Sequence, residues 1–246
     1  MFMTQTTTFK LYKTNNSMID ITNDERIEMG KKYLFFDIES IDRRSKYICT
    51  FGYVLTDENF NILQKEDILI NPDVIEYDWY VLKNMFHYTK EAAISSPSFA
   101  EVFDKISGLV ENDDIVVMGY AIVNDLDYLR NDYDRLGYDT SRLYGYDIQL
   151  FYKQINSLVN GMKLFNLAKS FEIDTSKYIE HKSDDDAEVS MLIAKHYCDT
   201  MNLTIEEFIS KYDILVRPSA RKKQVKLNSW LVFCVLYLFV VDYFFC

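Results

Sequence analysis

The sequence predicts an α/β or α+β fold built as one main domain. Patterns typical of strands and of helices alternate along residues 31–215. The chain has 246 residues, of which 48% are hydrophobic, and its 19 Tyr and 17 Phe residues supply bulky core material. No linker rich in proline and glycine divides its middle, so we expect one globular domain over residues 31–215.

Three strand patterns come first in the chain. Residues 31–40 (KKYLFFDIES) predict a buried strand, and residues 47–56 (YICTFGYVLT) and 61–70 (NILQKEDILI) predict a second and a third. The polar stretch 57–59 between the last two is typical of a turn. We therefore expect the sheet to begin with a three-strand meander.

One further strand and several helices follow. Residues 114–120 (DIVVMGY) form a short apolar run that predicts a buried strand. Helices are predicted where apolar residues recur at spacings of three and four, and Gly137 is placed to end the second helix. The predicted helices span residues 99–111, 124–138, 163–173 and 184–201.

The charge of the chain limits the kinds of partner that it can bind. It carries 38 acidic and 27 basic residues, a formal net charge of −11, which disfavours passive, nonspecific adhesion to nucleic acid. A nuclease is not excluded, because carboxylates that hold divalent cations add negative charge while the bound metal reverses the field that a phosphate meets. Arg43, Arg44 and Lys46 would attract phosphate locally or, alternatively, belong to a solvated loop.

The first acidic motif, LFFDIES, lies in the first predicted strand. Side chains alternate between the two faces of a strand, so Asp37 and Glu39 share one face while Phe36 and Ile38 point to the other. Two carboxylates so close repel each other unless a proton or a cation neutralises them, and their hard oxygen atoms suit Mg²⁺ or Mn²⁺. The motif therefore predicts a metal site, with a chance acidic pair in an acidic chain as the alternative.

The second motif, GYAIVNDLDYL, lies where a predicted helix follows a buried strand. Asp125, near the start of this helix, would project from the edge of the sheet toward a crevice. Asp127 lies about 200° around the helix from it, so only one of the two should face a site. The alternative for Asp125 is structural, because an acidic residue at a helix N-terminus is favoured by the helix dipole.

The third motif, HKSDDDAEVSMLIA, places His181 five residues before Asp186. An imidazole on a loop just before a helix that carries a carboxylate would set a base beside a metal ligand. As alternatives, His181 is an ordinary surface histidine, and Asp184 and Asp185 cap the helix or are solvated. The order of the three motifs together favours an active site.

Taken in this order, FDIE, YAIVNDLDYL and HKSDDDA resemble the three exonuclease motifs of the DEDDh group, which belongs to the DnaQ-like or RNase T-like exonucleases. The segments FHYTKEAAISSPSFAEVFDKI and KLFNLAKSFEID also look like parts of this family, and the resemblance spans residues 31–200. In the sister group a tyrosine stands four residues before the last acid, where this chain has Lys182. The resemblance implies a ribonuclease H-like α/β fold, with a mixed central sheet of about five strands flanked by helices.

The resemblance also implies roles for five motif residues. Asp37, Glu39, Asp125 and Asp186 would hold two divalent cations, Mg²⁺ or Mn²⁺, and His181 would act as general base. The implied reaction is hydrolysis at the 3′ end of DNA or RNA, which releases nucleoside monophosphates. A polymerase or another protein partner is consistent with this family.

Four further residues are predicted to contact the 3′-terminal nucleotide. His87, within FHYT, matches a family histidine that lies close to the bound nucleotide, and Ser40 stands where threonine is common. Ile41 and Tyr120 would offer apolar and aromatic surface to the terminal base, with packing in the core as the alternative. The family often carries His-Asn where this chain has Tyr120 and Ala121, so we expect substrate binding to differ there.

Two other functions compete with this interpretation. A ribonuclease H-like endonuclease also uses four carboxylates, but a histidine five residues before the last acid disfavours it. A non-catalytic binding or membrane-tethered module on the same fold is disfavoured because all five catalytic residue types are present.

The two ends of the chain differ from its middle. Residues 1–30 are polar and lack periodicity, which predicts a weakly ordered or accessory segment without a signal-peptide core. The four cysteines show no paired spacing, and together these features favour a cytoplasmic location.

Residues 216–246 combine the basic run RKKQVK with an apolar tail. The uninterrupted apolar stretch of this tail is shorter than the about 20 residues that a membrane-spanning helix needs. A C-terminal membrane anchor therefore competes with an interfacial segment and with a helix packed on the domain or on a partner.

Overall fold

The computed structural model describes residues 30–41, 47–73, 78–212 and 214–219. The predictions for the polar leader, for Arg43, Arg44 and Lys46, and for the apolar tail from residue 220 onward lie outside the described residues. Within the described ranges, no helix is long and apolar enough to cross a membrane.

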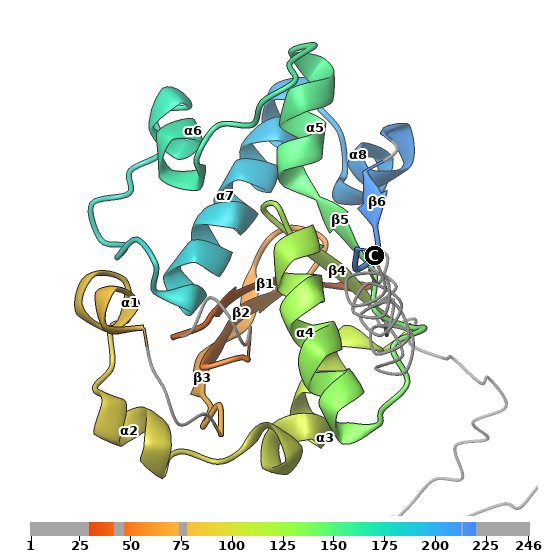
Figure 1. The fold of residues 1–246 in the computed structure, drawn as a ribbon. Coiled ribbons are helices and arrows are strands. Elements are labelled where there is room, and N and C mark those ends of the chain that lie inside the picture. The colour runs from red at the N-terminus through yellow and green to blue at the C-terminus, as the bar shows by residue number, and fades with distance from the viewer. Residues whose placement is uncertain (1–29, 42–46, 74–77, 213, 220–246) are drawn as a thin grey trace, which may run out of the picture. The chain divides into compact units, whose positions relative to one another are not determined.

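A six-stranded mixed sheet with the order β3-β2-β1-β4-β5-β6 forms the centre of the domain (Figure 1). The first three strands pair as an antiparallel meander. β4 pairs parallel with β1, β5 pairs parallel with β4, and β6 forms the edge of the sheet, antiparallel to β5. The predicted meander and mixed sheet are therefore confirmed. β5 and β6 are only three and two residues long, which is too short for a sequence pattern to reveal. The strands are β1 (Lys32–Glu39), β2 (Thr50–Thr56), β3 (Ile62–Leu69), β4 (Ile115–Gly119), β5 (Gly145–Asp147) and β6 (Leu215–Val216).

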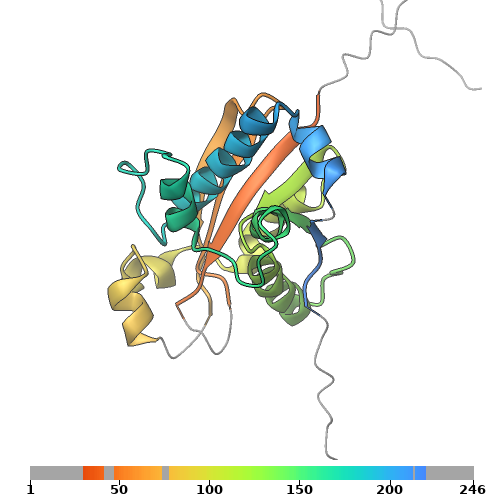
Figure 2. The same ribbon diagram turned by 90° about the horizontal axis from the view of Figure 1, so that it is seen from above.

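Helices cover both faces of this sheet (Figures 1 and 2). The long helix α7 lies against β1 and β2 on one face, together with α5, α6 and α8, and α3 and α4 cover the other face. The four predicted helices are confirmed as α3, α4, α6 and α7, and Gly137 ends α4 in a left-handed conformation, with a φ of 78°. The others have six to eight residues, too few for a clear apolar period. The helices are α1 (Trp79–Asn84), α2 (Lys90–Ser95), α3 (Phe99–Val110), α4 (Val123–Leu136), α5 (Ile148–Ile155), α6 (Leu164–Ser170), α7 (Ser183–Met201) and α8 (Ile205–Lys211).

The alternation of side chains along β1 determines toward which face of the sheet the acidic residues at its C-terminal end point. Tyr33 and Phe35 belong to the apolar cluster under α7, whereas Leu34 and Phe36 belong to the cluster under α3 and α4. Because side chains alternate with a period of two, the acidic residues at positions 37 and 39 continue the face that α7 covers.

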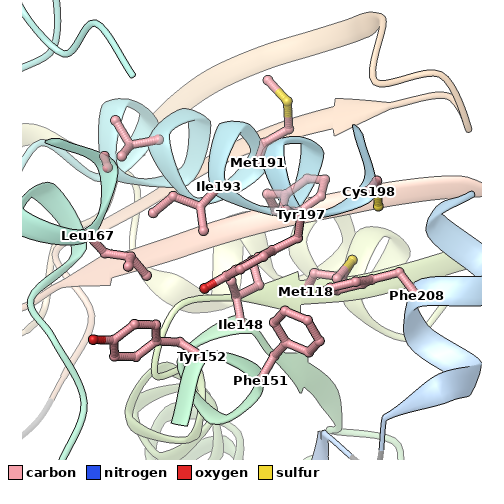
Figure 3. Packing of buried hydrophobic residues seen from close by; sticks show 14 of the residues in the cluster. Met118, Ile148, Phe151, Tyr152, Leu167, Met191, Ile193, Tyr197, Cys198 and Phe208 are labelled. Carbon is pink, nitrogen blue, oxygen red and sulfur yellow. The ribbon is translucent and has the colours of Figure 1, made fainter. Parts of the chain in front are cut away.

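Aromatic packing holds the C-terminal half of α7 in place (Figure 3). The ring of Phe151 on α5 lies 4.5 Å from the ring of Tyr197 on α7 and 4.3 Å from that of Phe208 on α8. Such pairs contribute about 0.5–1.5 kcal/mol each beyond the burial of their surface. The cluster therefore joins three helices on one side of the sheet.

A glycine brings the other end of α7 close to the sheet. A Cβ atom at Gly52 in β2 would lie 2.0 Å from the backbone nitrogen of Asp184 and 2.1 Å from the carbonyl carbon of Ser183. The hydroxyl groups of Thr50 and Ser183 also form a hydrogen bond across this contact. The first turn of α7 thus rests directly on the backbone of β2, next to the carboxyl end of β1.

We expect Gly52→Ala to lower the free energy of unfolding by about 1–3 kcal/mol or more, because backbone must move to admit the methyl group. Gly108→Ala is the matched control, since Gly108 is exposed in α3 and a Cβ there meets nothing within 4 Å. That control should raise stability by about 0.5–1 kcal/mol. Chemical denaturation of both variants measures the difference, and equal stabilities would contradict the close approach.

Candidate active site

Residues from β1 and from the start of α7 meet at one end of the sheet. Nδ1 of His181 lies 3.3 Å from Oε1 of Glu39. One possible ligand atom each from Glu39, His181 and Asp186 lies within 4.8 Å of the other two. Asp37 interacts electrostatically with this group, because the charges of Glu39 and Asp186 act on its carboxyl.

The first turn of α4 adds a fourth carboxylate. Asp125 is 6% exposed, and burial, followed by the charge of Glu39 in β1, raises the pKa of its carboxyl. Asp127 instead accepts a hydrogen bond from the backbone nitrogen of Ser219, at 2.7 Å, and pairs with Arg130. The prediction that only one of these two aspartates faces the site is confirmed.

Burial and mutual repulsion make this group of acids costly to ionise. Burial, followed by the charges of Asp125, Asp186 and Glu39, raises the pKa of Asp37 well above its usual range. Burial, followed by the charge of Glu39, raises the pKa of Asp125 as well. The same two causes raise the pKa of Asp186 to about 8, although His181 acts in the opposite direction. Such a cluster favours any species that supplies positive charge.

The donor atoms fit a divalent cation. Oδ2 of Asp37 and Oδ1 of Asp186 are buried, and neither accepts a hydrogen bond from any residue that the structure describes. Buried acceptors are otherwise almost always hydrogen-bonded, so each of these oxygens has capacity for a further ligand. All four carboxylates offer hard oxygen ligands, which Mg²⁺ and Mn²⁺ prefer.

His181 occupies a strained position in a tight turn. The turn is closed by a hydrogen bond of 3.1 Å from the backbone nitrogen of Lys182 to the carbonyl of Ile179. The φ of His181 is 67°, in the left-handed region, and a non-glycine residue there costs of the order of 1–3 kcal/mol. A hydrogen bond to Glu39 raises the pKa of His181, and burial opposes this increase.

Lys65 on β3 ties the start of α7 to the sheet. Its Nζ lies 2.7 Å from Oδ1 of Asp185 and 2.9 Å from Oε2 of Glu188, and Asp184 pairs with Lys182. The three acidic residues are buried, so the alternative that Asp184 and Asp185 are solvated is wrong. The sequence analysis did not identify Lys65. Its position in a predicted strand indicated only that its side chain would point to one face of the sheet, which is the face that α7 covers.

The segment after β1 is buried more deeply than predicted. Ile41 is fully buried in a small cluster with Cys49, Phe86 and Ala93, and Ser40 is buried beside it. This burial agrees with the packing alternative for Ile41, and its contact with a nucleobase stays a prediction. Contact between Ser40 and a substrate stays a prediction.

The turn before α4 is held by hydrogen bonds that the sequence did not reveal. The hydroxyl of Tyr120 donates to the carbonyl of Met162 at 2.6 Å, and the half-buried ring packs on the apolar cluster of α7. Ala121 has a φ of 54°, and its N–H donates to Oδ1 of Asp147 at 3.1 Å. Asp147 thus helps to orient the start of α4, where Asp125 lies. Stacking of Tyr120 on a base stays a prediction.

His87 lies in the segment between α1 and α2. It is exposed, and its Nε2 lies 2.9 Å from the carbonyl oxygen of Glu180, the residue before His181. Contact between His87 and a bound nucleotide stays a prediction.

Comparison with known proteins agrees with this geometry. The exonuclease family model RNase T matches residues 34–194, a range that contains the four carboxylates and the turn histidine. No curated protein sequence matches the chain significantly.

Solved structures share the fold at low sequence identity. Exonuclease I superposes with a TM-score of 0.59 at 20% identity, over 69% of this chain and 41% of exonuclease I. The E. coli enzyme in complex with a dA16 oligonucleotide gives a TM-score of 0.57 at 20% identity, over 69% of this chain and 41% of the enzyme. The nuclease domain of 3′hExo, a DEDDh family member bound to rAMP, gives 0.59 at 12% identity, over 71% and 94%. The chain thus spans less than half of exonuclease I.

The raised pKa of Asp186 predicts how stability depends on pH when divalent metal is removed by a chelator. Between the ordinary value of 3.8 and about 8, the folded protein keeps a proton that the unfolded chain has released. The free energy of unfolding should therefore fall as the pH rises through this window. We expect the melting temperature in chelator to be lower at pH 8 than at pH 5.

Asp186→Asn tests the origin of this effect. The amide cannot ionise, so this variant should melt above the wild type at pH 8 in chelator and should gain less from added Mg²⁺. Thermal unfolding of both proteins at the two pH values, with and without Mg²⁺, gives the comparison. An identical loss of stability with pH in wild type and variant would refute the assignment.

Proposed function

Because the chain belongs to the RNase T exonuclease family, we propose that it removes nucleoside monophosphates from the 3′ end of DNA or RNA in a metal-dependent reaction. The observation that carries the proposal is the meeting of His181 with Glu39 and Asp186, whose possible ligand atoms lie within 4.8 Å of one another. A base beside buried carboxylates is the arrangement that hydrolysis of a phosphodiester with divalent cations needs.

Four residues would hold two divalent cations, Mg²⁺ or Mn²⁺. These are Asp37 and Glu39 from β1, Asp125 from α4 and Asp186 from α7. Bound cations supply positive charge that stabilises the attacking and leaving oxygens of the scissile phosphate. The unsatisfied oxygens of Asp37 and Asp186 and the raised pKa values of the buried acids support this assignment.

His181 is the proposed general base. Its side chain is 40% exposed, so a water molecule can reach the imidazole and the ring can pass a proton on to solvent. Glu39, 3.3 Å from Nδ1, orients the ring toward the carboxylates. The imidazole would accept the proton of the attacking water as its oxygen bonds to the phosphorus and the bond from the phosphorus to the leaving 3′ oxygen of the remaining chain breaks.

DNA and RNA are both included in the proposal because deoxyribonucleotides and a ribonucleotide are bound in proteins of similar fold. Exonuclease I structures contain dA16 and dT13 oligonucleotides, and the 3′hExo nuclease domain contains rAMP. The formal net charge of −11 favours a substrate bound at the metal site over nonspecific adhesion along the surface.

We expect Asp37→Ala and Asp186→Ala to abolish nuclease activity, because each removes a proposed cation ligand. His181→Ala should lower kcat by roughly 10²- to 10⁴-fold, the usual effect of losing a general base. Release of mononucleotides from 3′-labelled single-stranded DNA, duplex DNA and short RNA, with Mg²⁺ or Mn²⁺, measures both effects.

A pair of aspartates on one helix provides the control. Asp125→Ala should be inactive, whereas Asp127→Ala should keep its activity, because Asp127 faces Ser219 instead of the site. Internal cleavage before any terminal mononucleotide appears would favour an endonuclease. Full activity in either Asp37→Ala or Asp186→Ala would exclude the proposed site.

A further inference from the structure

The direction in which His181 leaves the backbone depends on one peptide plane. His181 is the third residue of the turn from Ile179 to Lys182, and its φ of 67° is that of the third residue in a type II turn. Rotation of the peptide plane between Glu180 and His181 would give a type I turn, in which the third residue has a negative φ. Any contact that fixes this plane also fixes where the imidazole points.

His87 makes such a contact. Its Nε2 lies 2.9 Å from the carbonyl oxygen of Glu180, which belongs to the peptide plane that precedes His181. A carbonyl oxygen can only accept, so Nε2 carries the hydrogen and donates it. Rotation of the plane would move this oxygen away from His87 and break the hydrogen bond.

The backbone around His87 is itself anchored. On one side Phe86 is 8% exposed and packs with Ile41, Cys49 and Ala93. On the other side the hydroxyl of Tyr88 donates to Oδ2 of Asp67 on β3, at 2.5 Å. Because both neighbours are held by the domain, His87 is presented to the turn from a fixed position.

We propose that His87 is a positioning residue, which holds the peptide plane of Glu180 and so directs His181 toward Glu39. As far as it concerns catalysis, this inference rests on the proposed nuclease function. It differs from the direct contact with a nucleotide that the family resemblance implies for His87. The two roles predict different kinetics.

Steady-state kinetics separates them. His87→Ala should lower kcat about 3- to 10-fold, the range expected for loss of one exposed hydrogen bond, with KM unchanged. His87→Gln should restore most of the lost kcat, because its side-chain amide can donate to the same carbonyl. His196→Gln, at the histidine in the C-terminal half of α7, is the matched control and should change neither constant. A raised KM with unchanged kcat in His87→Ala would assign His87 to the substrate instead.

A double-mutant cycle tests whether His87 acts through His181. In the His181→Ala background, His87→Ala should have no further effect on kcat, because the group that it positions is gone. If the two losses multiply instead, His87 acts independently and the proposal fails.

Hydrogen exchange tests the inference without any activity. In the full-length, metal-free protein, His87→Ala should speed amide exchange in the turn 179–182 while the exchange of β1 and the melting temperature stay as in the wild type. Unchanged exchange in the turn would overturn the inference even if the enzyme is active. An inactive wild type with faster exchange in the variant would instead refute the proposed function and support the positioning role.

Discussion

Repulsion among buried carboxylates is the constraint that the rest of the domain must satisfy. Asp37, Asp125 and Asp186 are all more difficult to ionise than ordinary aspartates, because burial and neighbouring acids act on each. Nothing within the acidic group itself draws these side chains together. The attraction that keeps them close must therefore come from contacts outside the group, and the structure distributes these contacts along α7.

Three kinds of contact hold α7 against this repulsion. Its C-terminal half is packed among aromatic rings, its first turn rests on the bare backbone at Gly52, and Lys65 neutralises the acids beside that turn. Two of them act at the N-terminal end of the helix, beside Asp186, and the aromatic packing acts on its C-terminal half, so both ends of α7 are held. The turn that carries His181 is joined to α7 by a hydrogen bond of 3.1 Å from the backbone nitrogen of Ile179 to Oδ2 of Asp185, and to His87 through the carbonyl of Glu180.

The parts of the site that local patterns encode were predictable, and the parts that arise from long-range contact were not. Strand alternation placed Asp37 and Glu39 on one face, and helical geometry separated Asp125 from Asp127, because both depend on neighbours in sequence. The burial of Ile41 depends on segments up to about fifty residues away, which pack over it only in the folded chain. Pairing of Lys65 with α7 likewise needs the register of the whole sheet.

The alternation of β1 also affects which changes in length the chain tolerates. Both acids of this strand reach the site only because they are an even number of residues from Tyr33 and Phe35 in the core under α7. Deletion of one residue between Phe35 and Asp37 would turn both carboxylates toward α3 and α4 while leaving the composition of the strand almost unchanged. Insertions and deletions in β1 should therefore be far more harmful than most substitutions, and a pair of added residues less harmful than one.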